Sequence, residues 1–266
     1  MVCGIKNMKK RNEIVLLTIL ILLFFTINYS WIDGYFVKVF ENADKEDFNV
    51  KRVIDGDTIV VGNDTHVRLF GINTPEKGEK YYDEAKNFLE DLILNKTIFI
   101  KSFGQDKYYR ELGVVFLDGE NINAKIIENG FANVYILDDK TYEEDFRKSW
   151  DKCLETEKNL CEFSEDKCAR CVELRELDYK NQEIIFYNKC DFSCDLENWE
   201  IKDEGRKKFI FDDFILGRNQ EVKVIVGNFT NSGNNLYWKD ESYVWTETGD
   251  TLFLRDTNNK LVLWKN

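Results

Sequence analysis

The sequence predicts a mainly β protein with some helix, built as an OB-type five-stranded β-barrel with helices and followed by a β-sandwich. Between residues 48 and 157, short β-branched runs alternate with segments of helical periodicity. Beyond about residue 172 the pattern changes to short apolar runs separated by clusters of Asn and Gly, which is typical of a sandwich. A chain of 266 residues is long enough for two ordinary domains of this kind.

The barrel prediction rests on five strands interrupted by helices. The expected strands are residues 48–54, 57–62, 65–71, 97–100 and 112–117. Apolar residues at helical spacing predict helices over residues 82–94, 122–129 and 142–157. An OB-type barrel has this composition, and its face and loops commonly bind nucleic acid.

The residues that could take part in catalysis or metal binding are concentrated in one short stretch, residues 53–76. It holds Asp57 in a tight turn, Arg68 on a strand, and the loop Asn73-Thr74-Pro75-Glu76, which contains the one proline of the chain and is stiffened by it. Carboxylate and loop oxygens suit a hard cation, and an arginine fork suits phosphate. Taken alone, the stretch is equally consistent with a surface hairpin that has a solvated acidic turn and an ion pair.

Charge and histidine content exclude several classes of function. With 37 basic and 49 acidic residues the net charge is −12, so the protein does not hold nucleic acid by bulk charge. Any phosphate must be met by a local cluster. His66 is the one histidine, which argues against Ser-His-Asp or Cys-His catalysis and against a His-rich zinc site.

Residues 1–33 read as a membrane anchor or signal segment. Four basic residues precede the run from Ile14 to Ile32, which is close to the length that crosses a bilayer. The positive-inside rule places the start in the cytoplasm and the rest outside. We expect a single-pass membrane protein, or a secreted one if the segment is cleaved. Residues 34–47 are polar and acidic and are interpreted as a tether.

Six cysteines follow the predicted export segment. They are Cys153, Cys161, Cys168, Cys171, Cys190 and Cys194. In an exported protein an even number predicts three disulfides, with 15 possible pairings. The spacing from Cys168 to Cys194 also fits a structural Zn²⁺ site, which is the second interpretation. Residues 158–171 are interpreted as a Cys-rich linker between the two domains.

Three motifs between residues 48 and 157 resemble the thermonuclease (staphylococcal nuclease) family. They are Val53-Ile54-Asp55-Gly56-Asp57-Thr58, then Arg68 with Asn73-Thr74-Pro75-Glu76, then Asp106-Lys107-Tyr108-x-Arg110. The segments Asn121–Ala124 and Asn129–Ala132 resemble that family's second helix and the turn after it. The resemblance implies an OB-type barrel, one Ca²⁺ ion, and hydrolysis of phosphodiesters in DNA and RNA, preferably single-stranded, to 3′-phosphate ends.

The resemblance also implies a role for each matching residue. The catalytic residues would be Arg68, Glu76 and Arg110; the substrate-binding residues Lys107 and Tyr108; and the metal ligands Asp57, Asn73 and the carbonyl of Thr74. Glu76 would act as the general base for the attacking water. One departure concerns the metal: the family has an aspartate where this chain has Asn73, so one negative charge is lost. The family's base-stacking tyrosine has no clear match, although Tyr135 and Ile136 lie nearby in the sequence.

Residues 172–266 resemble the lamin tail domain family. The matching segments are Asp195–Asp203, Val244-Trp245 and Gly249–Asp256. This resemblance implies an immunoglobulin-like sandwich that binds or positions a partner, whose identity cannot be read. We find no catalytic constellation in this part of the sequence, and interpret Trp199, Trp245 and Trp264 as packing residues.

The sequence therefore supports two main functions. The first is an exported calcium-dependent nuclease with an accessory binding domain. The alternative is a non-catalytic nucleic-acid-binding or cell-surface interaction protein built on the same domains. Arg68, Glu76 and Arg110 favour the enzyme, whereas Asn73 and the acidic net charge favour the alternative.

Overall fold

The computed structural model describes residues 47–135, 139–246 and 250–265. The predicted membrane segment, residues 1–33, lies outside the described residues, as does the tether except for its last residue. Within the described part of the chain, no helix is both long and apolar enough to cross a membrane.

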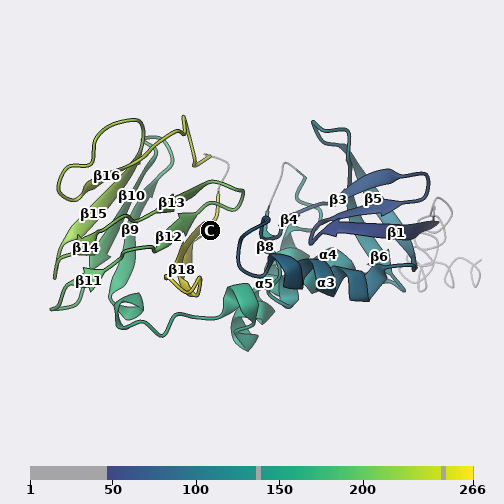
Figure 1. Ribbon diagram of the computed structural model, residues 1–266, viewed down its shortest axis with the longest axis horizontal. Helices are drawn as coiled ribbons and strands as arrows, with labels where there is room; N and C mark the ends of the chain where they lie inside the picture. Colours follow the sequence, from purple (N-terminus) through teal and green to yellow (C-terminus); the bar gives the residue numbers. More distant parts are fainter. Residues whose placement is uncertain (1–46, 136–138, 247–249, 266) are drawn as a thin grey trace, which may run out of the picture. The chain divides into compact units, whose positions relative to one another are not determined.

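The first half is a closed five-stranded barrel, which confirms the OB-type prediction (Figure 1). Its strands are β1 (Asp47–Asp55), β2 (Thr58–Val61), β3 (Thr65–Leu69), β5 (Thr97–Gln105) and β6 (Glu111–Leu117). Neighbours pair in the order β3-β2-β1-β5-β6, and parallel pairing of β3 with β6 closes the barrel. β7 (Glu120–Asn121) extends β6 through a hairpin, and β4 (Ile72–Asn73) pairs separately with β8 (Asn133–Val134).

Three helices in the described residues accompany the barrel, each within one residue of its predicted ends. They are α3 (Tyr82–Ile93), α4 (Ile122–Glu128) and α5 (Glu143–Thr156). The Asn121 side chain caps α4 by accepting the Ala124 N–H, which satisfies a donor left free at the helix start. Gly130 follows α4 with φ +70°, the left-handed conformation in which glycine commonly ends a helix.

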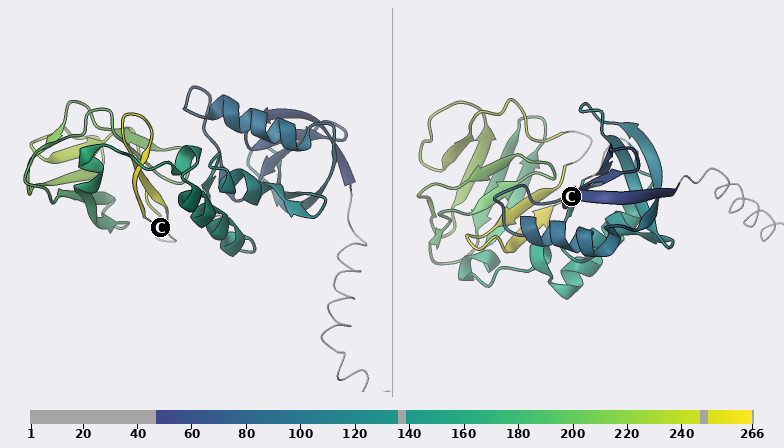
Figure 2. Two further views of the ribbon diagram at one scale, coloured as in Figure 1. Left: turned by 90° about the horizontal axis from the view of Figure 1, so that it is seen from below. Right: turned by 45° about the vertical axis from the view of Figure 1, so that its right-hand side comes forward.

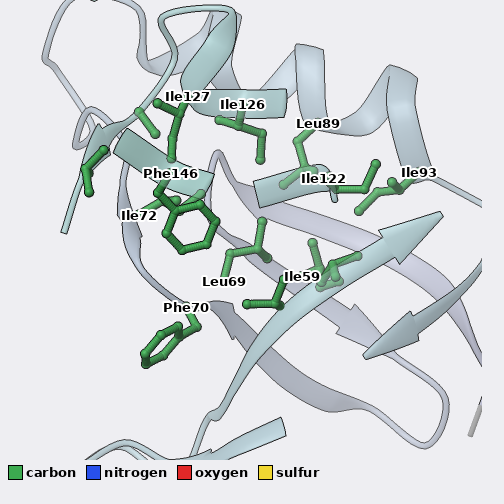
Figure 3. Close-up of a cluster of buried hydrophobic side chains, with 14 of the residues drawn as sticks. Ile59, Leu69, Phe70, Ile72, Leu89, Ile93, Ile122, Ile126, Ile127 and Phe146 are labelled. Atoms are coloured by element: carbon green, nitrogen blue, oxygen red, sulfur yellow. The ribbon is translucent and has the colours of Figure 1, made fainter. Parts of the chain in front are cut away.

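The barrel core lies between the strands and these helices. In Figure 3 the side chains of Ile59 and Leu69 from the barrel lie opposite those of Leu89 and Ile122 from the helices, and all four are fully buried. Apolar burial of this kind stabilises by about 25 cal/mol per Å². One polar side chain, Asn123, is also fully buried and ties α4 to the ends of the strands. It accepts from the Val115 N–H and donates to the carbonyls of Phe70 and Gly113.

The second half is an immunoglobulin-like sandwich, as expected (Figure 2). One sheet has the order β16-β15-β10-β9, the other β13-β12-β17-β18, and β11 pairs with β14. The strands are β9 (Val172–Asp178), β10 (Glu183–Asn188), β11 (Cys194–Asp195), β12 (Glu200–Lys202), β13 (Lys208–Ile210), β14 (Ile215–Leu216), β15 (Glu221–Val226), β16 (Asn235–Trp238), β17 (Leu252–Arg255) and β18 (Leu261–Lys265). Trp199 and Trp245 are buried in the sandwich core, as predicted for packing residues.

All six described cysteines form disulfides, so the zinc interpretation was wrong. The pairs are Cys153–Cys161, Cys168–Cys194 and Cys171–Cys190. Each sulfur is bonded to another sulfur, so none is available as the thiolate that Zn²⁺ requires. The first disulfide closes the loop that follows α5, and the other two tie the η2 turn (Lys167–Arg170) to the sandwich.

The described residues from Phe48 onward form one compact unit. Phe253 from β17 joins the barrel's core cluster, where its ring packs edge-on against Trp150 of α5 with centroids 5.6 Å apart. Trp264 contacts the same Trp150 ring, at 6.1 Å. The buried Arg255 donates to the Leu160 carbonyl at 2.7 Å. The sandwich strands β17 and β18 therefore pack directly on the helical side of the barrel domain.

Candidate active site

Asp57 lies at the centre of the site, in the turn between β1 and β2. The residue is 4% exposed. Oδ1 pairs with Nε of Arg68 at 3.1 Å and accepts from the Thr58 hydroxyl at 3.1 Å. Oδ2 accepts from the backbone N–H and the hydroxyl of Thr74, at 3.1 and 2.9 Å. One carboxylate thus joins three separate segments of the stretch singled out in the sequence.

The close contact between Asp57 and the Thr74 loop requires a glycine at position 56. A Cβ added to Gly56 would lie 2.9 Å from the side-chain atoms of both Thr74 and Ala85. Real Cβ atoms do not approach so closely, so a side chain at this position would push the turn away from the Thr74 loop. The tight turn is what lets Asp57 reach Thr74.

A second carboxylate, Asp55, sits in the same turn and accepts the Asp57 N–H through Oδ1 at 3.1 Å. Burial, and then the negative charge of Asp57, raise the pKa of Asp55 above its usual range. The nearby charge of Asp57, in a poorly solvated turn, disfavours the charged form of Asp55. A bound cation would relieve this repulsion.

Arg68 fastens β3 to the loop that follows it. Nη1 donates to the carbonyls of Leu69 and Ile72, at 2.6 and 2.9 Å, and Nη2 donates to Oδ1 of Asn73 at 3.2 Å. The residue is only 7% exposed. Its guanidinium therefore holds the loop by hydrogen bonds and also places a positive charge beside Asp57.

The Asn73 amide is used in both directions. Its oxygen accepts from Arg68, and its Nδ2 donates to the carbonyl of Gly205 in the sandwich domain at 2.6 Å. An aspartate here could not donate to that carbonyl. The asparagine that departs from the family pattern thus has a second, physical use that the sequence did not reveal.

The turn between β5 and β6 positions Arg110. Oδ1 of Asp106 accepts the backbone N–H groups of Tyr108 and Arg110, and Oδ2 pairs with Nε of Arg110 at 2.7 Å. Burial would raise the pKa of Asp106, but these hydrogen bonds from Arg110 outweigh it and the pKa is lowered. Nη1 of Arg110 reaches the Thr58 hydroxyl at 3.5 Å. Because Thr58 also bonds Asp57, Arg110 borders the same site.

Lys107 and Tyr108 lie on the exposed part of this turn. Tyr108 is 64% exposed, and the ammonium of Lys107 and the guanidinium of Arg110 lie 5.1 and 5.6 Å from the centroid of its ring. An exposed aromatic face beside two cations suits contact with a nucleotide.

Glu76 is placed differently from the other candidates. Its N–H donates to Oε2 of Glu79, which bends the loop after Pro75. Its carboxylate pairs with Nε of Arg206 at 2.7 Å, and the two side chains are 43% and 59% exposed. Arg206 and Gly205 belong to the connection between β12 and β13 of the sandwich. Sequence reasoning missed both, since no motif marks them and they lie over 120 residues away.

Direct hydrogen bonds thus join Asp57, Arg68, Asn73 and Thr74, and Thr58 links this group to Arg110. Glu76 lies two residues beyond Thr74. Among the described residues, no group of three or more His, Cys, Asp or Glu side chains is arranged to hold a metal ion. The expected ligand set is of another kind, with one carboxylate, one amide and one backbone carbonyl.

A small barrel that connects two arginines to a buried carboxylate, with an exposed glutamate on the adjoining loop, is the arrangement expected of a phosphodiester-hydrolysing nuclease. Residues 66–162 match the family described as Staphylococcal nuclease homologue, and residues 169–264 match the Lamin Tail Domain. The chain belongs to the staphylococcal nuclease family and carries a lamin tail domain after the barrel. Both resemblances seen in the sequence are confirmed.

Individual relatives agree with this assignment. The chain is 36% identical over 136 residues to a thermonuclease of Staphylococcus intermedius, an alignment covering 47% of this chain and 81% of that protein. It is 31% identical over 128 residues to an uncharacterized endonuclease of Haemophilus influenzae, covering 47% and 66%. It is 27% identical over 166 residues to a thermonuclease of Staphylococcus hyicus, covering 58% and 98%.

Proposed function

We propose that this protein is an exported, calcium-dependent nuclease that hydrolyses phosphodiester bonds of DNA and RNA, preferably single-stranded, to leave 3′-phosphate ends. The observation that carries the proposal is the connected group around Asp57. It joins a buried carboxylate directly to Arg68 and Thr74 and, through Thr58, to Arg110.

The two arginines would act on the phosphate in different ways. A phosphodiester gains negative charge as it is attacked, and a guanidinium that is better placed for that added charge than for the ground state lowers the barrier. Nε, Nη1 and Nη2 of Arg68 all have protein partners, so Arg68 contributes charge while holding the loop. Within the described residues Nη2 of Arg110 has no partner, which leaves donors for a phosphate oxygen.

Calcium is the cation that the donor set fits. Asp57, the amide oxygen of Asn73 and the carbonyl of Thr74 would hold it, and all are the hard oxygen ligands that Ca²⁺ takes. The mutual repulsion of Asp55 and Asp57 supports a cation at this turn. When bound, the ion would offset the charge of the phosphate and favour the attacking water.

Glu76 would orient that water and accept a proton from it at a carboxylate oxygen. The water oxygen forms a bond to phosphorus, the bond from phosphorus to the 5′ oxygen breaks, and the 5′ oxygen takes up a proton. Lys107 and Tyr108, exposed beside Arg110, would contact the nucleotide next to the scissile bond.

Export is the proposed setting, with the protein anchored by residues 1–33 or secreted after their removal. Three disulfides support it, because disulfides persist in oxidising compartments outside the cytosol. The lamin tail domain would be an accessory binding module.

A cleavage assay on denatured DNA tests the proposal, run with calcium and with a chelator, beside Arg68→Ala and Glu76→Ala. We expect calcium-dependent cleavage that both substitutions reduce at least about a hundredfold, the scale at which single transition-state contacts act. Full cleavage by either variant would refute that residue's role. Binding of DNA without cleavage at any calcium concentration would instead favour the non-catalytic interpretation.

A further inference from the structure

We propose that Arg206, supplied by the lamin tail domain, is a positioning residue for Glu76, so that the nuclease site is completed by the second domain. The inference rests on the proposed function and extends it. It assigns to the sandwich a part in the chemistry rather than only in binding a partner.

The connection between β12 and β13, residues 203–207, runs along the loop that carries Glu76. Nε of Arg206 pairs with Oε1 of Glu76 at 2.7 Å. The neighbouring Gly205 carbonyl accepts from Asn73 at 2.6 Å. On the adjoining strand β12, the ammonium of Lys202 pairs with Glu79 at 2.9 Å. Three polar contacts therefore join the second domain to the segment that carries Asn73, Glu76 and Glu79.

This connection is anchored within its own domain. Asp203 and Lys207 exchange two hydrogen bonds, since Oδ1 of Asp203 accepts the Lys207 N–H at 2.9 Å and the Asp203 N–H donates to the Lys207 carbonyl at 3.1 Å. Oε2 of Glu204 accepts from the N–H and the hydroxyl of Thr251, both at 3.2 Å. Asp203 and Glu204 are buried, so the backbone that presents Arg206 is held on both sides of Gly205.

Glu76 needs such a partner. Its side chain is 43% exposed on a loop, where a carboxylate samples several rotamers unless something holds it. Among the described residues, Arg206 is the one ion-pair partner of that carboxylate. A guanidinium presented from this anchored backbone restricts the orientations of the carboxylate. Small errors in the placement of a base are costly to rate. We therefore expect Arg206 to act through Glu76 and to change kcat more than KM.

The test uses the full chain with Arg206→Ala, Arg206→Lys and the control Arg218→Ala. Arg218 is an exposed arginine of the same domain, in the turn between β14 and β15, so its removal makes the same change in charge. On denatured DNA with calcium, we expect Arg206→Ala to lower kcat about tenfold with KM changed less than about twofold. Arg206→Lys should recover part of the loss, because the ammonium keeps the charge but not the guanidinium geometry. Arg218→Ala should match the parent chain.

A double substitution separates positioning from a structural effect. In a Glu76→Gln background, Arg206→Ala should cause no further loss, since residues that act as a unit are not additive. An equal loss in both backgrounds would overturn the inference and indicate a purely structural contact. A rise in kcat on removing Arg206 would overturn it too, and would indicate an inhibitory contact. Arg206→Ala behaving like Arg218→Ala, with an active parent chain, would defeat the inference and leave the proposed function standing. A parent chain without cleavage would defeat both.

Discussion

At the scale of single residues, Asn73 shows how one side chain serves two demands. It faces Arg68 with its oxygen and Gly205 with its nitrogen, so the amide is the side chain that satisfies both neighbours. Its position in the motif could be predicted from the sequence, and so could the grouping of Asp57, Arg68 and Arg110 at one site. Gly205 and Arg206 could not, because the contact from Asn73 to Gly205 spans 132 residues and nothing local signals it.

Asn73→Asp tests this double use. We expect calcium to bind several-fold tighter, because ligand charge raises affinity for a hard cation. In chelator, the same change should lower the free energy of unfolding by about 1 to 2 kcal/mol, because a carboxylate oxygen would face the Gly205 carbonyl with no proton to share. Calorimetric titration and urea unfolding measure the two effects. Unchanged or weaker calcium binding would contradict the assignment of Asn73 as a ligand.

The two arginines should separate in the same experiments. Arg68→Ala removes the hydrogen-bond donor to the carbonyls of Leu69 and Ile72 and leaves Asp57 buried without its ion pair. We therefore expect this variant to lose about 3 kcal/mol of stability as well as activity. The Arg110 side chain is 24% exposed. When it is removed, Asp106 still accepts hydrogen bonds from the two backbone N–H groups of residues 108 and 110. Arg110→Ala should therefore cost activity with less than about 1 kcal/mol of stability. Equal stability losses in urea unfolding would contradict this division.

At the scale of elements, local sequence patterns predicted the helices well but did not predict the pairing of very short strands. The three helices lie within one residue of expectation because helical spacing of apolar residues is read inside a single segment. By contrast, β4 and β8 are two residues each, and their pairing places Asn73 opposite Asn133 from a distant part of the chain. The disulfide partners, likewise, depend on three-dimensional proximity that spacing does not encode.

Gly71 offers a test of how closely α5 packs on the turn between β3 and β4. Its φ is +77°, and an added Cβ would overlap the Phe146 ring. We expect Gly71→Ala to destabilise by about 3 kcal/mol or more through strain and overpacking together. Gly119→Ala is the matched control, with φ +85° and nothing within 4 Å of the added Cβ, and should lose only about 1 kcal/mol. Similar midpoints for the two variants in urea would refute the close packing.

At the scale of the whole molecule, the contact between the barrel and the sandwich is the feature that the sequence could not reveal. Each domain is recognisable from its own segment, yet Phe253 and Trp264 pack on Trp150, and Arg206 reaches Glu76. The net charge of −12 was a poor guide for a similar reason. Net charge is a sum over the whole chain, whereas the fold links Arg68 and Arg110 locally through Asp57 and Thr58.

Stability should depend on pH through the acidic residues that anchor the connection carrying Arg206. Burial, and then the charge of Asp250, raise the pKa of Glu204 to about 7, and burial raises the pKa of Asp203 to about 6. A carboxyl whose pKa is higher in the folded state binds a proton on folding. Its contribution is therefore most favourable below its unfolded pKa and is lost as pH rises through the folded value.

We accordingly expect the free energy of unfolding in chelator to fall by about 4 kcal/mol between about pH 5 and pH 8, with Glu204 the largest single source. Glu204→Gln should flatten this decline, because the amide carries no charge to desolvate. Glu197→Gln, at an exposed position on the same domain, should leave the decline unchanged. Urea unfolding at several pH values measures the slope. A slope in Glu204→Gln equal to that of the parent chain would show that the buried acidic residues do not control the stability of this connection.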